Sequence, residues 1–431
     1  MHARTLVQWV LVLTLAYAFP ALATLLDSRQ VPTLPSAALT PAEQAYQRGL
    51  QRLAGGDLKA SEQAFQQALK LDPQSAQAML GLAEIAFRNK RRDDAGQWIQ
   101  RAVQAAPGSS EAQASLGRYL AIQGKAKEAE AALIKSAKLD ASAVRPRVDL
   151  GDLLSSQGRF PEAVKLYQEA LSINPQHAGA HYALGIGLAR LKDNVKAQSE
   201  LELAASLEPK NPLPQLALAR LYASLNDPVK ALQATDKALA LQSGLVDALL
   251  LRGDLLQVTK NTALAIKSYQ AATQAAPKLV LPHMKIAMLA HRTNQKELAA
   301  ASYKRVLELD PKQAIAYNNL ASLALEHKQN LAQAEIWARK AVEIAPNVAD
   351  FHDTLGWTLR ARGNIKGALD SMRKAVQFDP KNPEVQYHLG AIYAEMGDKL
   401  KAKEALRQAL ATPNPFPSLN EAKKLLASLD I

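Results

Sequence analysis

Motifs of catalytic or metal-binding residues are few in this chain, and each lacks part of the pattern that its chemistry needs. His177 and His181 have the spacing of two metal ligands, but no carboxylate or third histidine lies near them in the sequence, so we interpret them as surface histidines. Segment 185–187 (G-I-G) begins like a dinucleotide fingerprint, yet Arg190 replaces the third glycine and no strand precedes it. Segment 371–374 (S-M-R-K) matches S-x-x-K without its companion motifs. The chain has no cysteine, which excludes disulfides and thiolate sites. We therefore expect no enzyme, no cofactor and no bound metal.

Proline recurs at a fixed interval, and this recurrence sets the architecture. Stepping 34 residues from Pro107 reaches Ala141 and then Pro175, and only the interval from Pro311 to Pro346 lengthens, to 35. The pairs that keep the interval of 34 are Pro73 and Pro107, Pro175 and Pro209, Pro277 and Pro311, and Pro346 and Pro380. A period held this long predicts a stack of similar supersecondary units instead of one globular core.

Small residues recur within each unit. One column, in the first half of the units, comprises Gly49, Ala83, Gly117, Gly151, Gly185, Ala219, Gly253, Ala287, Ala321, Gly356 and Gly390. Another, in the second half, is almost entirely alanine, from Ala95 to Ala402. Polar turns such as 156–159 (S-Q-G-R) separate the halves, where glycine can end a helix in the left-handed conformation. Each unit is therefore predicted to be two helices whose backbones approach closely at the small residues, with proline opening the next unit where its missing N–H costs nothing.

This pattern resembles the tetratricopeptide repeat, a helix–turn–helix of 34 residues, in about eleven copies over 42–414. The resemblance implies an all-α solenoid, a right-handed superhelix whose first helices line a concave groove. Residues 415–431 would form a C-terminal cap, with an amphipathic helix over 418–429. Two segments, 353–357 (D-T-L-G-W) and 382–390 (N-P-E-V-Q-Y-H-L-G), further resemble repeat proteins of the bacterial envelope linked to exopolysaccharide export and PEP-CTERM sorting.

The N-terminus has the order of a secretory signal peptide. His2 and Arg4 precede an uncharged apolar run, and Pro20 stands before the A-L-A of 21–23. Cleavage after Ala23 would leave 24–41 as a proline-containing linker. The alternative is an uncleaved anchor in the inner membrane formed by residues 5–26. Both readings place the repeats in the periplasm, with Arg4 on the inner side.

The chain is basic, with a net charge of +12. The basic residues are dispersed: Lys90, Arg91 and Arg92 are followed at once by Asp93 and Asp94. We interpret this as a solvated surface of mixed charge, and we expect no nucleic-acid partner.

The groove is the expected place of binding. Helical spacing puts a set of apolar and basic side chains on the face of the first helices opposite the packing face. The candidates are Tyr182, Ile186, Leu216, Arg220, Met284, Met288, Arg292, Trp357, Arg360 and Tyr387. Apolar anchors with an Arg/Asp rim, which includes Arg118, Arg145 and Asp152, would suit an extended or helical segment of another protein. The alternative is that these apolar side chains are buried between neighbouring first helices, as in any solenoid.

The sequence thus favours a non-enzymatic scaffold of the bacterial cell envelope. Its partners would be other proteins, components of the envelope or of secretion, and it would support exopolysaccharide export or envelope protein assembly. The alternative is a carbohydrate-facing accessory module of a polysaccharide secretion machine, for which only Trp357, Tyr387 and Tyr393 are clustered enough. Membrane contact is expected only through an uncleaved N-terminal segment.

Overall fold

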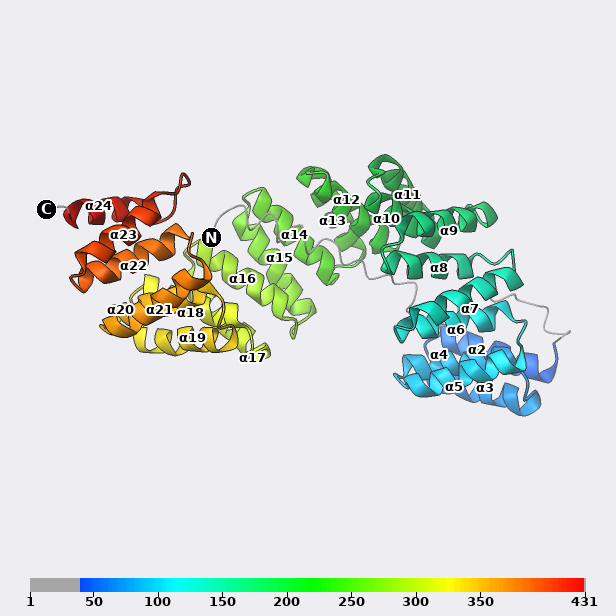
Figure 1. Cartoon of the computed structure of the whole chain (residues 1–431). Helices are drawn as coiled ribbons and strands as arrows, with labels where there is room; N and C mark the ends of the chain where they lie inside the picture. Colours follow the sequence, from blue (N-terminus) through cyan, green and yellow to red (C-terminus); the bar gives the residue numbers. More distant parts are fainter. Residues whose placement is uncertain (1–38, 430–431) are drawn as a thin grey trace. The chain divides into compact units, whose positions relative to one another are not determined.

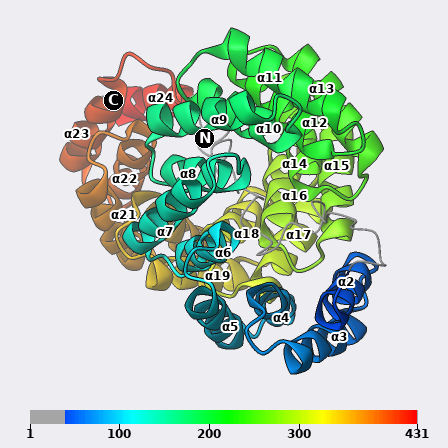
Figure 2. The same cartoon turned by 90° about the vertical axis from the view of Figure 1, so that its right-hand side faces the viewer.

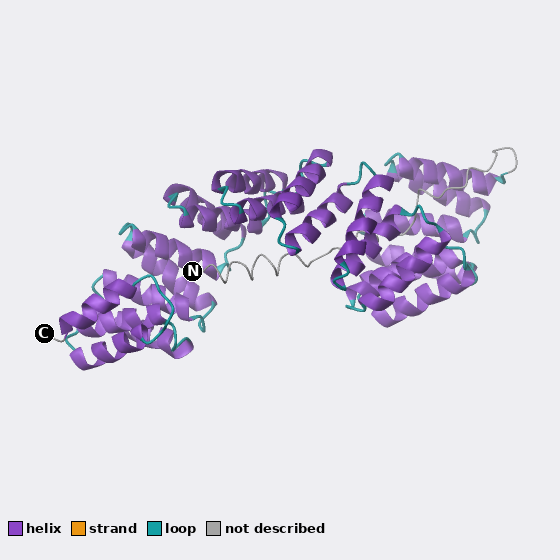
Figure 3. Cartoon of the chain, turned by 90° about the horizontal axis from the view of Figure 1, so that it is seen from above, coloured by secondary structure: helices purple, strands orange, loops and turns teal. Residues whose placement is uncertain are grey.

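The computed structural model describes residues 39–429, which fold into helices and turns without a strand (Figures 1 and 3). These residues form two compact units that divide after Ser243. The predicted signal peptide (1–23) and almost all of the linker (24–41) lie outside the described residues. Within the described range, no helix has both the length and the apolar character needed to span a bilayer.

The first unit consists of six helix pairs, seen from a second direction in Figure 2. They are α2 (Pro41–Ala54), α3 (Leu58–Leu71), α4 (Ala76–Arg88), α5 (Arg92–Ala105), α6 (Ser110–Ile122), α7 (Ala126–Leu139), α8 (Arg145–Ser156), α9 (Phe160–Ile173), α10 (Ala178–Arg190), α11 (Asn194–Leu207), α12 (Pro212–Ser224) and α13 (Pro228–Leu241). The even-numbered helices are the predicted first helices.

The second unit consists of five further pairs and a final helix. They are α14 (Val246–Val258), α15 (Thr262–Ala275), α16 (Val280–Arg292), α17 (Lys296–Leu309), α18 (Ala314–Glu326), α19 (Leu331–Ile344), α20 (Ala349–Ala361), α21 (Ile365–Phe378), α22 (Pro383–Glu395), α23 (Lys399–Leu410) and α24 (Leu419–Leu429). The structure therefore confirms the predicted all-α repeat fold with eleven helix pairs.

The predicted close approach at the small-residue column is confirmed. A Cβ built on Gly185 would lie 2.7 Å from the Cγ of Leu201 and 3.1 Å from the carbonyl oxygen of Ala197. A Cβ on Gly151 would lie 2.4 Å from the Cε1 of Tyr167. In both pairs the large side chain on the second helix stands sixteen residues after the glycine, so the missing Cβ provides the space for that side chain.

Left-handed residues close the turns inside the pairs. Gly124 (φ 76°) and Gly158 (φ 78°) adopt this conformation, as the sequence predicts. Lys90 and Lys192 adopt it in two pairs that lack a glycine there, with φ values of 61° and 64°. The left-handed conformation is less favourable for a residue with a side chain than for glycine, so the surrounding helices must hold these two turns in place.

The recurrent proline lies in the turn between pairs. Its position differs from the expectation, because it stands three residues before the helix instead of opening it. A side chain six residues further on fixes the turn. The Nε2 of His352 lies 2.7 Å from the carbonyl oxygen of Pro346, and the Nε2 of Gln386 donates to that of Pro380 at 2.9 Å. His181 makes the same contact in the first unit.

The last helix covers the end of the repeats, as predicted. α24 packs against α22 and α23 around a small core that contains Leu406, Phe416 and Ala422. Before it, the backbone N–H of Ser418 donates to Glu384 Oε2 at 3.1 Å. α24 therefore covers the apolar face of the final helix pair. Covering this face is the role of a capping element in a repeat protein.

Candidate functional site

The first unit buries two of its four predicted groove residues. Ile186 and Leu216 are only 3% and 4% exposed, whereas Tyr182 and Arg220 are half-buried. A side chain as buried as the first two cannot contact a partner in the described conformation. We therefore correct their assignment and place Ile186 and Leu216 in the helix-packing core.

The predicted charged rim of the first unit is also mostly buried. The Nη1 of Arg118 on α6 donates to Asp149 Oδ2 on α8 at 2.6 Å, and the Nε of Arg145 donates to Asp149 Oδ1 at 3.2 Å. Asp152 accepts a hydrogen bond of 2.8 Å from the hydroxyl of Tyr167. Burial, with a smaller contribution from the charge of Asp149, raises the pKa of Asp152 to about 8. These side chains therefore bond to one another between packed helices and do not form a surface for a partner.

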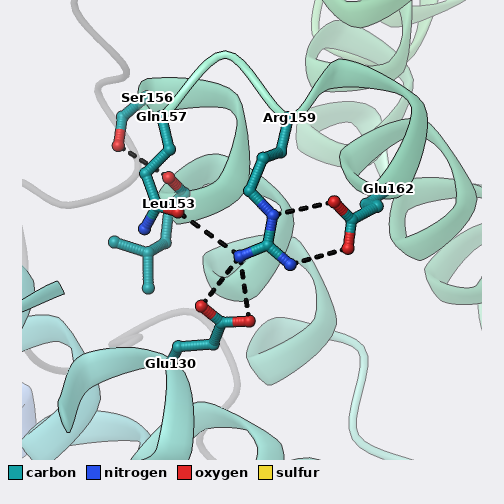
Figure 4. Close-up of polar contacts among 6 residues, drawn as sticks. All are labelled: Glu130, Leu153, Ser156, Gln157, Arg159 and Glu162. Atoms are coloured by element: carbon teal, nitrogen blue, oxygen red, sulfur yellow. Dashed lines mark hydrogen bonds and ion pairs between the residues drawn. The ribbon is translucent and has the colours of Figure 1, made fainter. Parts of the chain in front are cut away.

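Exposed charges in the first unit connect successive second helices. Arg159, which precedes α9, donates to Glu130 on α7 at 2.9 Å and to Glu162 at 2.6 Å (Figure 4). Arg91 and Glu62 repeat the arrangement two pairs earlier, at 2.8 Å. Each of these ion pairs is partly exposed to solvent, so each contributes little to stability on its own.

The second unit leaves an apolar side chain open on a first helix. Met288, near the end of α16, is 38% exposed, and Met284, one turn before it, is half-buried against Tyr303 and its neighbours. Arg292 is exposed and donates to the side-chain oxygen of Gln257 on α14 at 2.7 Å. We call Met284, Met288 and Arg292 the Met288 surface. A flexible thioether beside a guanidinium can adapt to an apolar partner with a polar border.

An aromatic cluster lies two repeats further on. The ring of Trp357 on α20 stacks on that of His388 on α22 at 3.9 Å between centroids, and Tyr387 lies 6.2 Å away. The guanidinium of Arg360 stands 4.5 Å from the centroid of Trp357 and donates to Glu395 at 2.6 Å. Trp357, Arg360, Tyr387 and His388 form what we call the Trp357 cluster. The predicted residues Trp357, Arg360 and Tyr387 are therefore brought together.

His388 was missed by the sequence analysis as a member of this cluster. Its Nδ1 lies 2.7 Å from Asp353 Oδ1, and its Nε2 lies 3.5 Å from Glu384 Oε1. His388 directly follows the candidate Tyr387 in the sequence, and this neighbourhood could have indicated it. Its contact with Trp357, however, depends on the packing of α20 against α22, which the sequence did not show. Its ring is therefore held between these two carboxylates and the indole of Trp357.

Among residues 39–429, no group of three or more His, Asp or Glu side chains is placed to hold an ion. The interpretation of His181 as a surface residue is wrong. Its side chain is buried, and its Nδ1 lies 2.5 Å from Glu200 Oε2, so it stabilises the turn and α11. His177 caps α10, because its Nδ1 accepts from the N–H of Ala180 at 3.0 Å.

Stacked antiparallel helix pairs of this kind define an α-solenoid. Family models described as "Tetratricopeptide repeat" match residues 46–110, 216–279, 284–349 and 383–412, and one described as "TPR repeat" matches 151–191 and 356–397. Together these ranges cover most of the sequence, so the chain belongs to the tetratricopeptide repeat family. Proteins of this family generally act as scaffolds that bind other proteins. A comparison with curated proteins finds no significant match.

Solved structures with similar folds are distant in sequence. A chain in the structure of the APC/C hetero-tetramer Cut9–Hcn1 is 12% identical, with a TM-score of 0.43 over 91% of this chain and 97% of that one. Yeast Tom70 is 15% identical, with a TM-score of 0.39 over 90% and 95%. PilF of Pseudomonas aeruginosa is 20% identical, with a TM-score of 0.42 over 48% of this chain and 94% of that one. Similarity at this level is no basis for assigning a function.

Proposed function

We propose that this protein is a non-enzymatic scaffold in the periplasm of a bacterial cell, where its second unit binds segments of envelope or secretion proteins. Membership of the tetratricopeptide repeat family supports a protein partner. The signal-like order of residues 1–23 supports export. The resemblance of segments 353–357 and 382–390 to envelope repeat proteins supports a role in exopolysaccharide export or envelope protein assembly.

The exposure of Met288 is the observation that carries the proposal. Equivalent positions three and four repeats earlier hold Ile186 and Asp152, both buried. Met288 instead leaves apolar surface open on a first helix, with the cation of Arg292 one turn away. A partner segment would gain by covering this thioether, because apolar anchors at the centre of an interface dominate binding energy.

Trp357 is the second proposed anchor. It packs in part against the core of the C-terminal repeats while Arg360 and His388 stack on its ring. These contacts hold the indole in one orientation, so little conformational entropy is lost when a partner covers its remaining surface. The same contacts make the carbohydrate alternative less favoured, because a sugar stacks on an open aromatic face. Tyr393, the third aromatic residue considered for it, is buried.

A site-specific crosslinking experiment tests the proposal. A photo-reactive amino acid at position 288, in intact cells, should capture a defined envelope protein. The same probe at Ile336, which is 60% exposed on α19, should not. With the captured protein purified, Met288→Ala and Trp357→Ala should each weaken binding about thirtyfold, the effect of losing about 2 kcal/mol.

Folding of the two variants must be checked separately. Met288 is exposed, so Met288→Ala should melt like the wild type, whereas Trp357→Ala loses its stacking on His388 and should melt lower. Unchanged affinity of the Met288→Ala variant would refute the groove proposal. Equal capture from positions 288 and 336 would refute it as well.

A further inference from the structure

The first unit carries a group of exposed aliphatic side chains that are not among the predicted groove residues. Leu191 and Val195 flank the turn between α10 and α11, at 42% and 83% exposure. Leu225 and Val229 flank the equivalent turn between α12 and α13, at 45% and 62%. Single exposed aliphatic residues are common, but four on two neighbouring turns form an apolar patch that needs an explanation.

The two turns occupy equivalent positions in consecutive helix pairs, 34 residues apart. The two pairs are packed together, because α12 contacts both α10 and α11. The carboxylate of Asp193 accepts from the N–H of Lys196 and that of Asp227 from the N–H of Lys230, which fixes the first turn of each second helix. The patch is therefore presented on a rigid frame.

Lysines are interleaved with the aliphatic residues. Lys192, Lys196 and Lys230 are all exposed, and the ammonium of Lys230 lies 5.6 Å from the ring of the half-buried Tyr222. Segments 190–196 and 224–230 together hold four basic and two acidic side chains, so the patch is net positive. We call Leu191, Lys192, Val195, Lys196, Leu225, Val229 and Lys230 the lysine–aliphatic edge.

We propose that the lysine–aliphatic edge rests on the surface of an anionic lipid bilayer. Aliphatic side chains at the tips of turns can enter the boundary between headgroups and acyl chains, while lysine stems extend along them and place their ammonium groups among the lipid phosphates. A tyrosine beside a lysine is also typical of the membrane–water interface. Neither the apolar nor the basic contribution suffices alone, and together they provide reversible attachment.

A bilayer suits this edge better than a protein does. Cores of protein interfaces are enriched in aromatic residues, methionine and arginine and depleted of lysine. The edge has the opposite composition, since its exposed members are leucine, valine and lysine. The Met288 surface, in the second unit, has the composition expected for a protein partner, so the two surfaces are assigned to different partners on chemical grounds.

The absence of cysteine from the sequence makes a local test direct. Full-length Val195→Cys, labelled with an environment-sensitive dye, is mixed with vesicles of equal parts phosphatidylglycerol and phosphatidylcholine. The emission should shift to the blue, and brominated lipid should quench it. The matched control is full-length Ile336→Cys, a similarly exposed aliphatic position on α19. Its label should not respond, even if residues 1–38 attach the chain to the vesicle.

The basic contribution is tested in the same labelled chain. Lys192→Glu combined with Lys230→Glu should raise the lipid concentration needed for half of the response about tenfold or more, because two favourable charges near the anionic surface become unfavourable. Adding salt should have the same effect.

Three outcomes would overturn the proposal. The label at position 195 could remain in water while the chain sediments with the vesicles. The labels at 195 and 336 could respond equally, which would mean attachment without a defined edge. Alternatively, Val195→Asp with Val229→Asp could abolish self-association in sedimentation equilibrium without changing the binding of a vesicle, which would make the edge a contact between copies of this chain.

Discussion

Replacing Gly185 by leucine perturbs the contact that sets the distance between two helices. A Cβ at this position would lie 2.7 Å from Leu201 Cγ and 3.1 Å from the carbonyl oxygen of Ala197. Unstrained carbon atoms approach to about 3.5–4.0 Å, so the first added atom already overlaps by roughly 1 Å. The flexible end of Leu201 can move, but the backbone of α11 can yield only if the two helices separate.

The expected loss of stability combines two opposing effects. Overpacking of a well-packed core costs about 1–3 kcal/mol, and the atoms of leucine beyond Cβ place Gly185→Leu in the upper part of that range, at about 2–3 kcal/mol. Removing glycine from a helix interior returns about 0.8–1 kcal/mol. The net destabilisation is therefore about 1–2 kcal/mol. This free energy corresponds to a five- to thirtyfold rise in the local opening equilibrium.

Hydrogen exchange and denaturant unfolding together measure this loss. Amides of α10 and α11 should lose protection five- to thirtyfold, while those of α2 to α5 keep theirs, because repeat stability is a sum over neighbours. Gly108→Leu is the matched control, because it makes the same change in an open turn. A Cβ built on Gly108 would have no heavy atom within 4 Å, so the free energy of unfolding of this variant should stay within about 0.5 kcal/mol of the wild-type value. Wild-type protection in Gly185→Leu, or an equal loss in Gly108→Leu, would refute the packing argument.

Three further predictions concern other parts of the chain. The folded protein keeps a proton on Asp152 up to about pH 8, whereas the unfolded chain releases it near pH 3.8. The free energy of unfolding of the wild type, relative to that of Asp152→Asn, should therefore fall as pH rises from about 4 to about 8 and then level off. A difference between the two proteins in urea unfolding that stays the same at every pH would contradict this. His352→Gln should preserve the melting temperature, because Gln386 makes the equivalent bond to Pro380. His352→Leu should instead lose about 0.5–1.5 kcal/mol, because it removes the hydrogen bond to the carbonyl oxygen of Pro346; equal melting of both variants would exclude that role. N-terminal sequencing of periplasmic protein should begin at Thr24, and a mature chain that begins at Met1 would indicate the anchor instead.

The fold could be predicted from the sequence because its determinants are local and recur. The proline interval, the small-residue column and the glycine turns each reflect contacts within one helix pair or between consecutive pairs. Gly151 and Tyr167, for example, are only sixteen residues apart and meet across one turn. The capping helix could be predicted for the same reason, because its apolar face follows from the spacing of apolar residues within eleven consecutive positions.

The exposure of the groove residues depended on contacts that no single repeat contains. Asp152, Ile186, Met288 and Trp357 occupy the same place on their first helices, so helical spacing treats them alike. The structure buries the first two, half-buries Trp357 and exposes Met288, because the side chains of the neighbouring pairs differ. The sequence by itself determined the repeat, its helices and its tight crossings. Tertiary packing between repeats decided which equivalent side chains stay in the core and which remain open to a partner.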